Sequence, residues 1–470
     1  MNTTLFSEVE TRLRQYNQQH LLHFCEELSG DQLERLLSQV SAVDFSLLTA
    51  AEENAVTTAL SQNEASRGAR AAAPKSVIRQ PSSDADLELR CQAATIGCQL
   101  LADGKVAVVT VAGGQGSRLG FEHPKGMYPI GPRSDRTLFQ IFAEQIQARQ
   151  KTHGAVIPWY LMTSAATHEE TVAFFEQNRF FGLSEDTVVF FQQASLPAID
   201  ANTGAILMES RAGLCLSPDG HGGMVTALQA SGALKRLAGQ GVEHIFYHQV
   251  DNPTVIMCDP VLLGLHAQHE SQVTTNVVEK TGPTERMGVL VDLDSRTEII
   301  EYSELTAEQA ASCDEKGQWI FWAGNTAIHV FRRDFLEYLT EDEIRLPLHR
   351  AHKKIAHIDS AGTTVEPAEP NAIKFERFIF DALPLAERTL IVEGDRQREF
   401  NPVKNATGSD SPDTSRAALS RIGREWLHQA GHSVDNDTVV EISPLKALTA
   451  EQLAECLTQG DVTIENFISE

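Results

Sequence analysis

Apolar residues in this chain occur both as short continuous runs and at helical spacing, and the two patterns alternate between residues 85 and 250. Continuous runs rich in β-branched and aromatic residues predict buried strands at residues 106–111, 156–162, 187–191 and 242–250. Apolar positions that recur every three or four residues predict helices at residues 85–102, 137–150, 167–178 and 223–237. This alternation is typical of an α/β sheet with helices on both faces, in which ligands bind at the carboxyl ends of the strands.

The two ends of the chain follow other patterns. Residues 8–60 carry leucines at helical spacing without a cluster of catalytic residue types, which predicts a helical accessory layer. Residues 62–84 are polar and small, as in a surface loop or linker, and the tail from Ala417 predicts a helix, a strand at residues 438–442 and a last helix. We therefore expect an N-terminal helical segment with its linker at residues 1–100, a central domain at 101–384 and a small α+β domain at 385–470.

A glycine-rich loop follows the first predicted strand. It reads A-G-G-Q-G-S-R-L-G from Ala112 to Gly120, and Pro124 and Lys125 close it. Glycines let the backbone turn its N–H groups toward one point, which makes an anion site, and Arg118 and Lys125 add two cations beside it. The loop matches neither the Walker pattern nor the dinucleotide fingerprint G-x-G-x-x-G. It predicts a cradle for the phosphates of a nucleoside triphosphate, and the alternative is a plain turn after a strand.

Three further segments place polar groups at turns and strand ends. F-F-Q-Q ends at Gln193, whose amide both donates and accepts as a uracil edge requires, although a solvated strand end would look the same. P-D-G-H-G-G at residues 218–223 is a second glycine turn and opens a helix. The strand at residues 242–250 delivers Asp251 at its carboxyl end, where a carboxylate suits Mg²⁺ with substrate phosphates, although Asp-Asn is also a common turn.

Composition and charge narrow the class of function. The 470 residues exceed one small core, and a net charge of −25 with a pI of about 5.0 argues against a general nucleic-acid or membrane-surface binder. Anionic substrates would therefore need a local cationic pocket. Seven scattered cysteines without a C-x-x-C pair indicate neither zinc nor a disulfide framework, and they favour a reduced, cytosolic compartment. No apolar run approaches the ~20 residues that span a membrane, and the first ten residues lack the apolar core of a signal peptide.

A histidine-rich segment raises the question of a metal site. His349, His352, His357 and Asp359 lie within eleven residues. Their spacing does not repeat one helical face well, and two lysines lie among them. We therefore expect a polar surface segment here.

Taken together, the motifs resemble those of the eukaryotic-type UDP-sugar pyrophosphorylases, and within them the UDP-N-acetylglucosamine (UDP-N-acetylhexosamine) pyrophosphorylase branch. The resemblance runs from about residue 20 to residue 420. It rests on A-G-G-Q-G-S-R-L-G-x-x-x-P-K-G-M, F-F-Q-Q, V-D-N, N-A-I-K-F-E-R-F-I-F-D at residues 371–381 and F-N-P-V-K-N at residues 400–405. It implies a central Rossmann-like nucleotide-diphospho-sugar transferase (GT-A-like) domain with a mixed sheet.

The resemblance also implies roles for individual residues. Arg118, Lys125 and Lys404 would be catalytic residues that neutralise the reacting phosphates, and Asp251 would bind Mg²⁺. The nucleotide-binding residues would be Ala112, Gly113, Gly114, Gln193 and Gly220. The sugar-binding residues would be His221, Gly288, Glu301, Asn325, Lys374, Phe378 and Phe380.

Two positions depart from the family pattern. His221 replaces the asparagine that the family associates with the N-acetyl group of the sugar, and a histidine here looks like the glucose-type enzymes. The family's G-N-x-x-N-H reads G-N-T-A-I-H, so that Ile328 stands for the second asparagine while His329 is kept. The departure at His221 leaves the choice of sugar open.

The implied reaction joins UTP and a sugar 1-phosphate, with N-acetylhexosamine 1-phosphate as the first expectation, to give a UDP-sugar and pyrophosphate. The alternatives are a glucose or galactose 1-phosphate uridylyltransferase and a nucleotide-sugar-binding protein without catalysis. We expect no nucleic-acid or membrane partner and a cytoplasmic location. Monomer and homodimer are equally compatible with the sequence.

Overall fold

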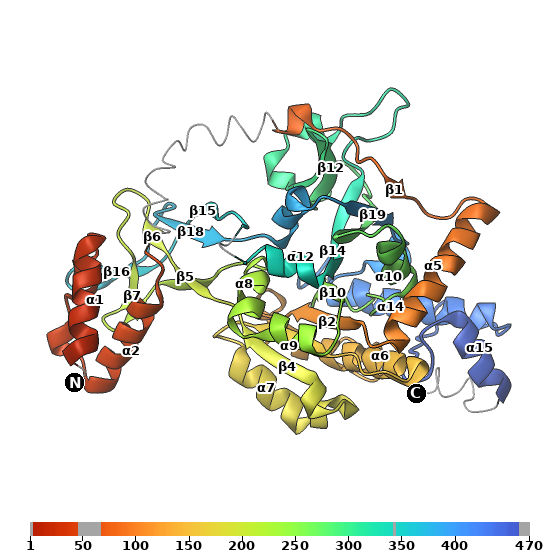
Figure 1. Ribbon diagram of the computed structural model, residues 1–470, viewed down its shortest axis with the longest axis horizontal. Helices are drawn as coiled ribbons and strands as arrows, with labels where there is room; N and C mark the ends of the chain where they lie inside the picture. Colours follow the sequence, from red (N-terminus) through yellow and green to blue (C-terminus); the bar gives the residue numbers. More distant parts are fainter. Residues whose placement is uncertain (1–2, 46–66, 342–344, 460–470) are drawn as a thin grey trace. The chain divides into compact units, whose positions relative to one another are not determined.

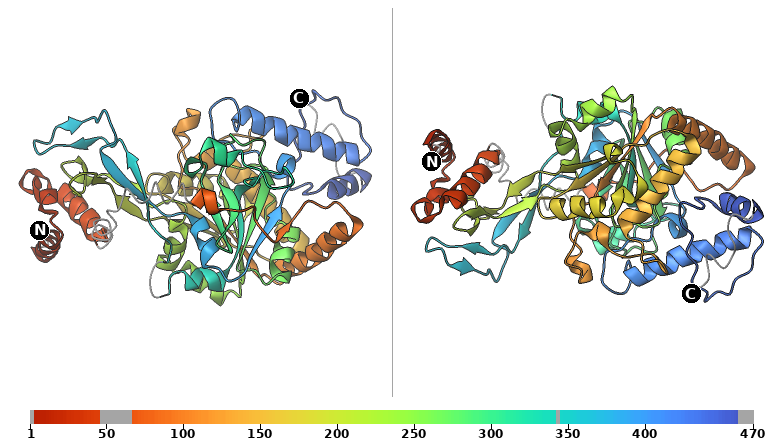
Figure 2. Two further views of the ribbon diagram at one scale, coloured as in Figure 1. Left: turned by 90° about the horizontal axis from the view of Figure 1, so that it is seen from above. Right: turned by 90° about the horizontal axis from the view of Figure 1, so that it is seen from below.

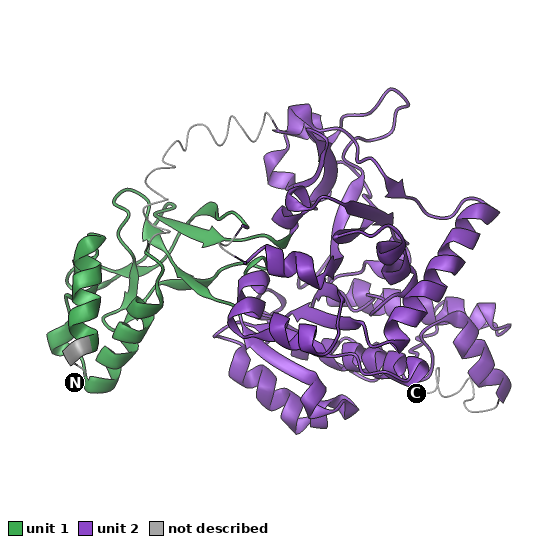
Figure 3. Ribbon diagram, viewed as in Figure 1, with its two compact units in different colours: residues 1–66, 193–223, 346–379 green, residues 67–192, 224–345, 380–470 purple. Residues whose placement is uncertain are grey.

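The computed structural model describes residues 3–45, 67–341 and 345–459, and these form two compact units (Figures 1 and 3). Unit 1 takes in residues 1–66, 193–223 and 346–379, and unit 2 takes in residues 67–192, 224–345 and 380–470. The helices expected at 46–60 and the first residues of the expected linker, 62–66, lie outside the described residues. The domain limits expected after residues 100 and 384 remain predictions.

A ten-stranded mixed sheet forms the centre of unit 2 (Figure 1). Its main path runs in the order β1-β19-β11-β14-β10-β2-β3-β4, and β12 and β13 pair beside β14. Neighbours among β10, β2, β3 and β4 are parallel, whereas β14 runs antiparallel to both β10 and β11. The strands are β1 (Val77–Ile78), β2 (Val106–Val111), β3 (Trp159–Thr163), β4 (Val188–Gln192), β10 (His244–Gln249), β11 (Val273–Glu279), β12 (Val289–Leu293), β13 (Arg296–Ile300), β14 (Ala323–Arg332) and β19 (Thr389–Glu393). The expected α/β fold with a mixed sheet is confirmed.

The central strands are continuous apolar runs because both of their faces are covered. Val106 and Val108 join one hydrophobic cluster with residues of helices α5, α6 and α10, and Ala107 and Val109 are equally buried. Helices lie on both sides of the sheet (Figure 2). The helices of unit 2 are α5 (Asp84–Ala102), α6 (Leu138–His153), α7 (His168–Gln177), α8 (Gly223–Ala230, starting at the last residue of unit 1), α9 (Ala233–Gly239), α10 (Pro260–Gln268), α11 (Ala307–Ala310), α12 (Arg333–Tyr338), α13 (Arg396–Glu399), α14 (Pro412–Gln429) and α15 (Ala450–Gln459).

Three sequence predictions in unit 2 need correction. The helix predicted at 223–237 is two helices, because Gly232 adopts a left-handed φ of 72° between α8 and α9. The segment predicted as a loop at 62–84 contributes β1, which pairs with β19. The strand predicted at 438–442 is wrong: Val440 donates its backbone N–H to Ser420 Oγ on α14 (2.9 Å) in place of a neighbouring strand.

Unit 1 has a hydrophobic core of its own. Helices α1 (Thr3–Gln15) and α2 (Gly30–Ala42) supply Leu13 and Leu36, which join Ile199 and Phe375 in one buried cluster. The predicted helical layer is therefore packed on strands that come from two distant stretches of chain. These strands are β5 (Ser195–Pro197), β6 (Ile199–Asp200), β7 (Met208–Ser210), β8 (Gly213–Leu214), β9 (Leu216–Pro218), β15 (His349–Lys353), β16 (His357–Ile358), β17 (Thr364–Val365) and β18 (Ala372–Glu376).

The histidine-rich segment becomes strands β15 and β16, with side chains that are exposed or half-buried. Across the described ranges, no group of three or more histidine, cysteine, aspartate or glutamate side chains is placed to hold a metal. In the same ranges, no helix has both the length and the apolar character needed to cross a membrane.

Candidate functional site

The glycine loop after β2 is fixed by backbone hydrogen bonds at both of its ends. The Ala112 N–H donates to the carbonyl oxygen of Met162 on β3 (2.8 Å), and the Lys125 N–H donates to that of Gly114 (3.0 Å). Two short 3₁₀ turns, η3 (Ser117–Leu119) and η4 (Lys125–Met127), leave Arg118 exposed and Lys125 half-buried. A Cβ atom built on Gly114 would meet no other atom within 4 Å. The loop therefore has a fixed backbone with open space above it.

Loops from three parts of unit 2 meet beside Lys125. Its Nζ lies 4.0 Å from Asp251 Oδ2 and donates to the carbonyl oxygen of Val403 (3.3 Å). The Val403 N–H in turn donates to the carbonyl oxygen of Asp251 (2.8 Å). Lys404 follows directly, with its Nζ 5.1 Å from the centroid of the Phe400 ring. The structure thus brings Lys125, Asp251 and the Lys404 loop to one place, at the carboxyl ends of β2 and β10.

Asp410 belongs to this cluster but is absent from the residues that the sequence predicts for the site. Its carbonyl oxygen accepts the N–H groups of Lys404 (2.7 Å) and Asn405 (2.9 Å). Burial raises the pKa of the Asp410 carboxyl, the cation of Lys404 acts against this, and the charge of Asp251 adds to the rise. Asp410 therefore places a second carboxyl group near Asp251. Only its position shortly after F-N-P-V-K-N could have pointed to it.

The role of Asp251 as a Mg²⁺ ligand remains a prediction, and the structure gives the surroundings of its carboxylate. Mg²⁺ is commonly held by one or two protein carboxylates together with phosphates. The Asp251 side chain follows β10, is 18% exposed and faces Lys125. Because no complete metal site exists within the described residues, a Mg²⁺ ion here would need phosphate oxygens from a bound nucleotide.

The turn P-D-G-H-G-G lies in unit 1 and is bound to the segment at residues 377–379. Gly220 has a left-handed φ of 87°, and a Cβ atom there would lie 2.4 Å from the carbonyl oxygen of Arg377, so that only glycine fits. The Ile379 N–H donates to His221 Nδ1 (3.2 Å), and the ring of Phe378 stacks on that of His221 at 5.4 Å. A neutral His221 therefore carries its proton on Nε2. The two predicted sugar contacts His221 and Phe378 are neighbours.

A buried ion pair lies under this turn. Asp219 is fully buried, its Oδ2 is 3.6 Å from Arg377 Nη1, and neither carboxyl oxygen accepts a hydrogen bond within the described residues. Burial raises the pKa of Asp219 to about 6, although the charge of Arg377 acts in the opposite direction. The aspartate inside P-D-G is visible in the sequence, but its partner Arg377 could not be inferred from that motif.

Gln193 and Lys374, two further predicted site residues of unit 1, differ in whether their polar groups already have a partner in the chain. Gln193 directly follows β4 and is buried, and its amide has no hydrogen-bond partner in the ranges that the structure describes. Lys374 on β18 is ion-paired with Glu376 (2.7 Å). Gln193 therefore keeps both a donor and an acceptor for a ligand, whereas the charge of Lys374 is met within its own strand.

The remaining predicted sugar contacts belong to unit 2. The Asn325 N–H donates to the carbonyl oxygen of Gly288 (2.9 Å), and a Cβ on Gly288 would lie 2.8 Å from Glu301 Oε1. Gly288, Glu301 and Asn325 are therefore neighbours, at the start of β12, the end of β13 and the start of β14. Phe380 is buried in the 3₁₀ segment η8 (Ile379–Leu385).

Known proteins similar to this chain are named as uridylyltransferases or pyrophosphorylases of UDP-sugars. Residues 61–432 match the family described as UTP–glucose-1-phosphate uridylyltransferase. The chain is 38% identical over 401 residues to UDP-N-acetylhexosamine pyrophosphorylase-like protein 1 of Xenopus tropicalis, covering 80% of this chain and 78% of that protein. It is also 38% identical over 370 residues to UDP-N-acetylglucosamine pyrophosphorylase of Saccharomyces cerevisiae, covering 77% of each. The crystal structure of the uridine diphosphate N-acetylglucosamine pyrophosphorylase from Trypanosoma brucei superposes with a TM-score of 0.81 at 27% identity, covering 96% of this chain and 94% of that one.

Proposed function

The chain belongs to the UTP–glucose-1-phosphate uridylyltransferase family, and we propose that it transfers a uridylyl group to an N-acetylhexosamine 1-phosphate. The first candidate for this substrate is N-acetylglucosamine 1-phosphate. It is a nucleotidyltransferase of the UDP-sugar class, with UTP and a sugar 1-phosphate as substrates and pyrophosphate as the second product. The observation that carries the chemistry is the meeting of Lys125, Asp251 and the Lys404 loop at the strand ends. The choice of sugar is supported by the names of its relatives.

The reaction is an in-line displacement at phosphorus. An oxygen of the sugar phosphate forms a bond to the α-phosphorus of UTP, while the bond from that phosphorus to the bridging oxygen breaks and its electron pair leaves with pyrophosphate. The nucleophile is already ionised near neutral pH, so no general base is required. Because both partners are anions, the protein must position them and neutralise their charge.

We assign this work to the cationic residues of unit 2. Arg118 and Lys125 would hold the leaving pyrophosphate, and Lys404 would neutralise the sugar phosphate. Asp251 would hold Mg²⁺, which when bound supplies further positive charge to the phosphate oxygens. Gln193 and Gly220 are the proposed uracil contacts, and the neighbouring pair His221 and Phe378 is proposed to contact the sugar, as are Gly288, Glu301, Asn325, Lys374 and Phe380.

Replacing Lys125 tests the proposed site directly. Lys125→Ala removes a phosphate-binding cation from a partly desolvated site, so we expect kcat/KM for UTP to fall by at least about a hundredfold. The matched control is Lys105→Ala, which removes a lysine that is paired with Glu243 (2.6 Å) at the opposite end of β2. Release of pyrophosphate at near wild-type rates by Lys125→Ala would contradict the assignment.

His221 supports a second candidate, a glucose or galactose 1-phosphate uridylyltransferase. The Ile379 N–H fixes the His221 ring against Phe378, which places a hydrogen-bonding ring where the family usually has an amide. A panel of N-acetylglucosamine, glucose and galactose 1-phosphates, with pyrophosphate release as the readout, separates the candidates. We expect the highest kcat/KM with the N-acetylated sugar; equal or higher values with glucose 1-phosphate would replace the proposal. UDP-sugar binding without turnover in Mg²⁺ would indicate a binding protein.

A further inference from the structure

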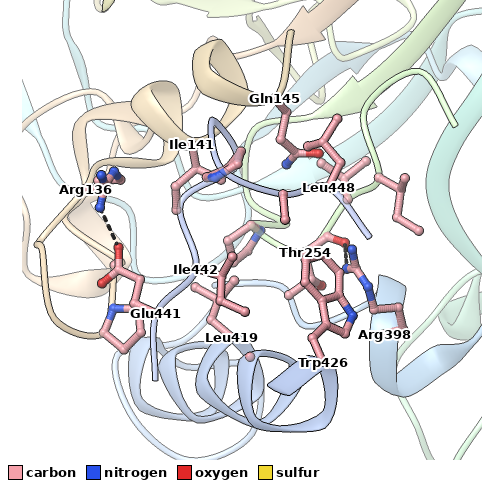
Figure 4. Close-up of a pocket in the computed structure, with 18 of the residues that line it drawn as sticks. Arg136, Ile141, Gln145, Thr254, Arg398, Leu419, Trp426, Glu441, Ile442 and Leu448 are labelled. Atoms are coloured by element: carbon pink, nitrogen blue, oxygen red, sulfur yellow. Dashed lines mark hydrogen bonds and ion pairs between the residues drawn. The ribbon is translucent and has the colours of Figure 1, made fainter. Parts of the chain in front are cut away.

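Unit 2 contains a cavity that none of the proposed site residues lines. It lies between α6, α14 and the segment at residues 441–448 (Figure 4). The volume that the centre of a water molecule can occupy inside it is about 80 Å³. One water needs roughly 10–15 Å³ of such room. The cavity is therefore large enough for several waters or one small organic molecule.

Two arginines on the cavity wall lack an anionic partner. Arg149, which is 6% exposed, donates its Nε–H to the carbonyl oxygen of Met257 (3.2 Å), and Arg398 donates from Nη1 to that of Thr254 (3.3 Å). Within the described ranges, neither guanidinium forms an ion pair at 4.0 Å or less. The terminal nitrogens of Arg149 make no hydrogen bond, yet protein atoms do not enclose them completely. A buried cation is normally paired, so these two guanidinium groups are suited to binding an anion.

Acidic side chains around these arginines bind other groups, and one of them, Asp395, accepts the backbone N–H groups of Gln397 (2.9 Å) and Arg398 (3.2 Å). Asp259 is the N-cap of α10 and accepts the N–H of Val261 (3.0 Å). Glu399 accepts from the side chain of Asn276 (2.9 Å), and Glu441 is paired with Arg136 (3.1 Å). Burial lowers the pKa of both Arg149 and Arg398. The longer-range charge of Asp259 acts against this at Arg149, and the charges of Glu399, Asp259 and Asp395 act against it at Arg398. An additional anion between the two arginines would therefore be stabilised.

The rest of the wall combines apolar side chains with the polar side chains of Arg136, Gln145 and Glu441. The guanidinium carbon of Arg398 lies 5.2 Å from the centroid of the Trp426 ring, so that the charged and apolar parts of the wall adjoin (Figure 4). The apolar part includes Ile141, Val255, Ile256, Leu419, Trp426 and Ile442. A ligand that fits this wall has one anionic group and a compact apolar body.

The same arginines contact the segment that follows Asp251. Thr254 and Met257 are their acceptors, and Thr254 donates its hydroxyl to Asn252 Oδ1 (3.0 Å), beside Asp251. The Asn252 oxygen also accepts the N–H of Asn401 (3.2 Å), on the loop that leads to Lys404. Arg398 is therefore connected through Thr254 and Asn252 to both loops of the candidate site, and Arg149 contacts the same segment at Met257.

We propose that this cavity binds a small organic anion, whose phosphate or carboxylate group is held by Arg149 and Arg398 and whose apolar body lies against Trp426 and Leu419. The second part of the proposal rests on the proposed function: occupancy changes the rate of uridylyl transfer through the segment at residues 252–257.

Binding is tested by calorimetry on the full chain. Phenyl phosphate and benzoate serve as the anionic probes and benzyl alcohol as the neutral one, with saturating UTP and Mg²⁺ present so that the nucleotide site is occupied. We expect saturable one-site binding of at least one anion, with at least tenfold weaker binding of the alcohol, and the stronger anion identifies the head group. Absence of saturable binding by both anions, or equal binding of the alcohol, would overturn the proposal.

Variants locate the probe in the cavity. Arg149→Gln removes one cation, and Leu419→Phe fills the space while leaving both arginines in place; each is expected to weaken binding at least tenfold. Arg388→Gln is the control, because it removes an exposed arginine paired with Glu270 (2.5 Å). If Arg149→Gln does not fold, Leu419→Phe decides, and unchanged affinity in that folded variant would refute the location.

Steady-state kinetics test separately whether occupancy of the cavity changes the rate of uridylyl transfer. At saturating probe, kcat or KM for UTP should change at least twofold in the wild type and remain constant in Leu419→Phe. An unchanged rate in a protein that binds the probe would refute the coupling. Because the binding measurement needs no turnover, failure of the proposed function would be recognised independently, by the absence of pyrophosphate release in the unliganded wild type.

Discussion

Gly114 is the residue at which the open side of the glycine loop is best tested. An alanine methyl group would meet no protein atom there, so Gly114→Ala should fold with an unchanged midpoint of thermal unfolding. The methyl group would occupy space above the loop where we place the nucleotide phosphates, and we expect KM for UTP to rise about tenfold or more.

The control for Gly114 is Gly30, where an added Cβ also meets nothing but which lies at the start of α2 in unit 1. Gly30→Ala should leave both KM and the unfolding midpoint close to wild type. A wild-type KM for UTP in Gly114→Ala would show that no nucleotide approaches this loop closely.

The raised pKa of Asp219 predicts how the free energy of unfolding depends on pH. Its pKa is raised from an ordinary value of 3.8 to about 6 in the folded chain, so the folded state holds this proton more tightly than the unfolded state. Ionisation of Asp219 therefore lowers the free energy of unfolding as the pH rises from about 4 through 6. The amide introduced by Asp219→Asn cannot ionise, so this variant should gain about 1–3 kcal/mol relative to wild type between pH 4.5 and pH 7.

Urea unfolding of both proteins across this pH range, followed by far-UV circular dichroism, measures that gain. The relevant quantity is the change in the difference between the two proteins, because the loss of a partner for Arg377 shifts the absolute stability of the variant at every pH. A difference that stays constant from pH 4.5 to pH 7 would contradict the raised pKa of Asp219.

Helices α5 and α10 cross with their backbones in contact. A Cβ atom on Gly97 of α5 would lie 1.9 Å from the carbonyl oxygen of Pro260, and one on Gly264 of α10 would lie 1.7 Å from that of Ala93. A glycine inside a helix usually lowers its stability by up to about 1 kcal/mol. Here the missing side chains allow the two helices to pack closely against the main core.

Gly264→Ala should therefore be strongly destabilising. The methyl group cannot be accommodated without separating the two helices, and we expect the free energy of unfolding to fall by about 3 kcal/mol or more. Gly239→Ala is the matched control, since this glycine ends α9 and an added Cβ meets nothing. Denaturant unfolding compares the two, and similar stabilities would show that the helix crossing is not close.

The local pattern of apolar residues predicts strands well where both faces of the strand are buried. The runs that became β2 and β10 are buried on both faces, and the acid that follows β10 is Asp251, whose Oδ2 lies 4.0 Å from Lys125 Nζ. The antiparallel insertion of β14 between β10 and β11 depends on partners distant in sequence, which no local pattern encodes. Val440 shows the same limit, because its β-branched neighbourhood resembles a strand while Ser420 takes its N–H.

In the candidate site, too, some residues could be predicted from local motifs and others could not. Motifs could point to Gln193, His221 and Lys404 because each lies in a short, distinctive string of residues. The partners that hold them could not be predicted: the carbonyl oxygen of Asp410 for the Lys404 loop, and Arg377 for the turn that contains His221. These contacts join segments that no local pattern connects, and only the folded chain brings them together.

At the scale of the whole molecule, the chain passes between two units whose main cores are separate. In the described residues, the cluster around Leu36 in unit 1 and the cluster around Leu263 in unit 2 have no member in common. Both leucines are completely buried, so that replacing either by alanine removes contacts from one core alone. Each replacement should lower the stability of its own unit by about 2–5 kcal/mol.

Hydrogen exchange measured by mass spectrometry on the full chain tests this separation. In Leu36→Ala, amides of β15 and β18 should lose protection while those of β2 and β10 keep it, because the second group is stabilised by a core that the substitution does not touch. Leu263→Ala should give the opposite pattern and serves as the reciprocal control. Equal loss of protection in both units with either variant would mean that the two cores unfold as one cooperative structure, and the division of the chain into two independently stabilised units would then be wrong.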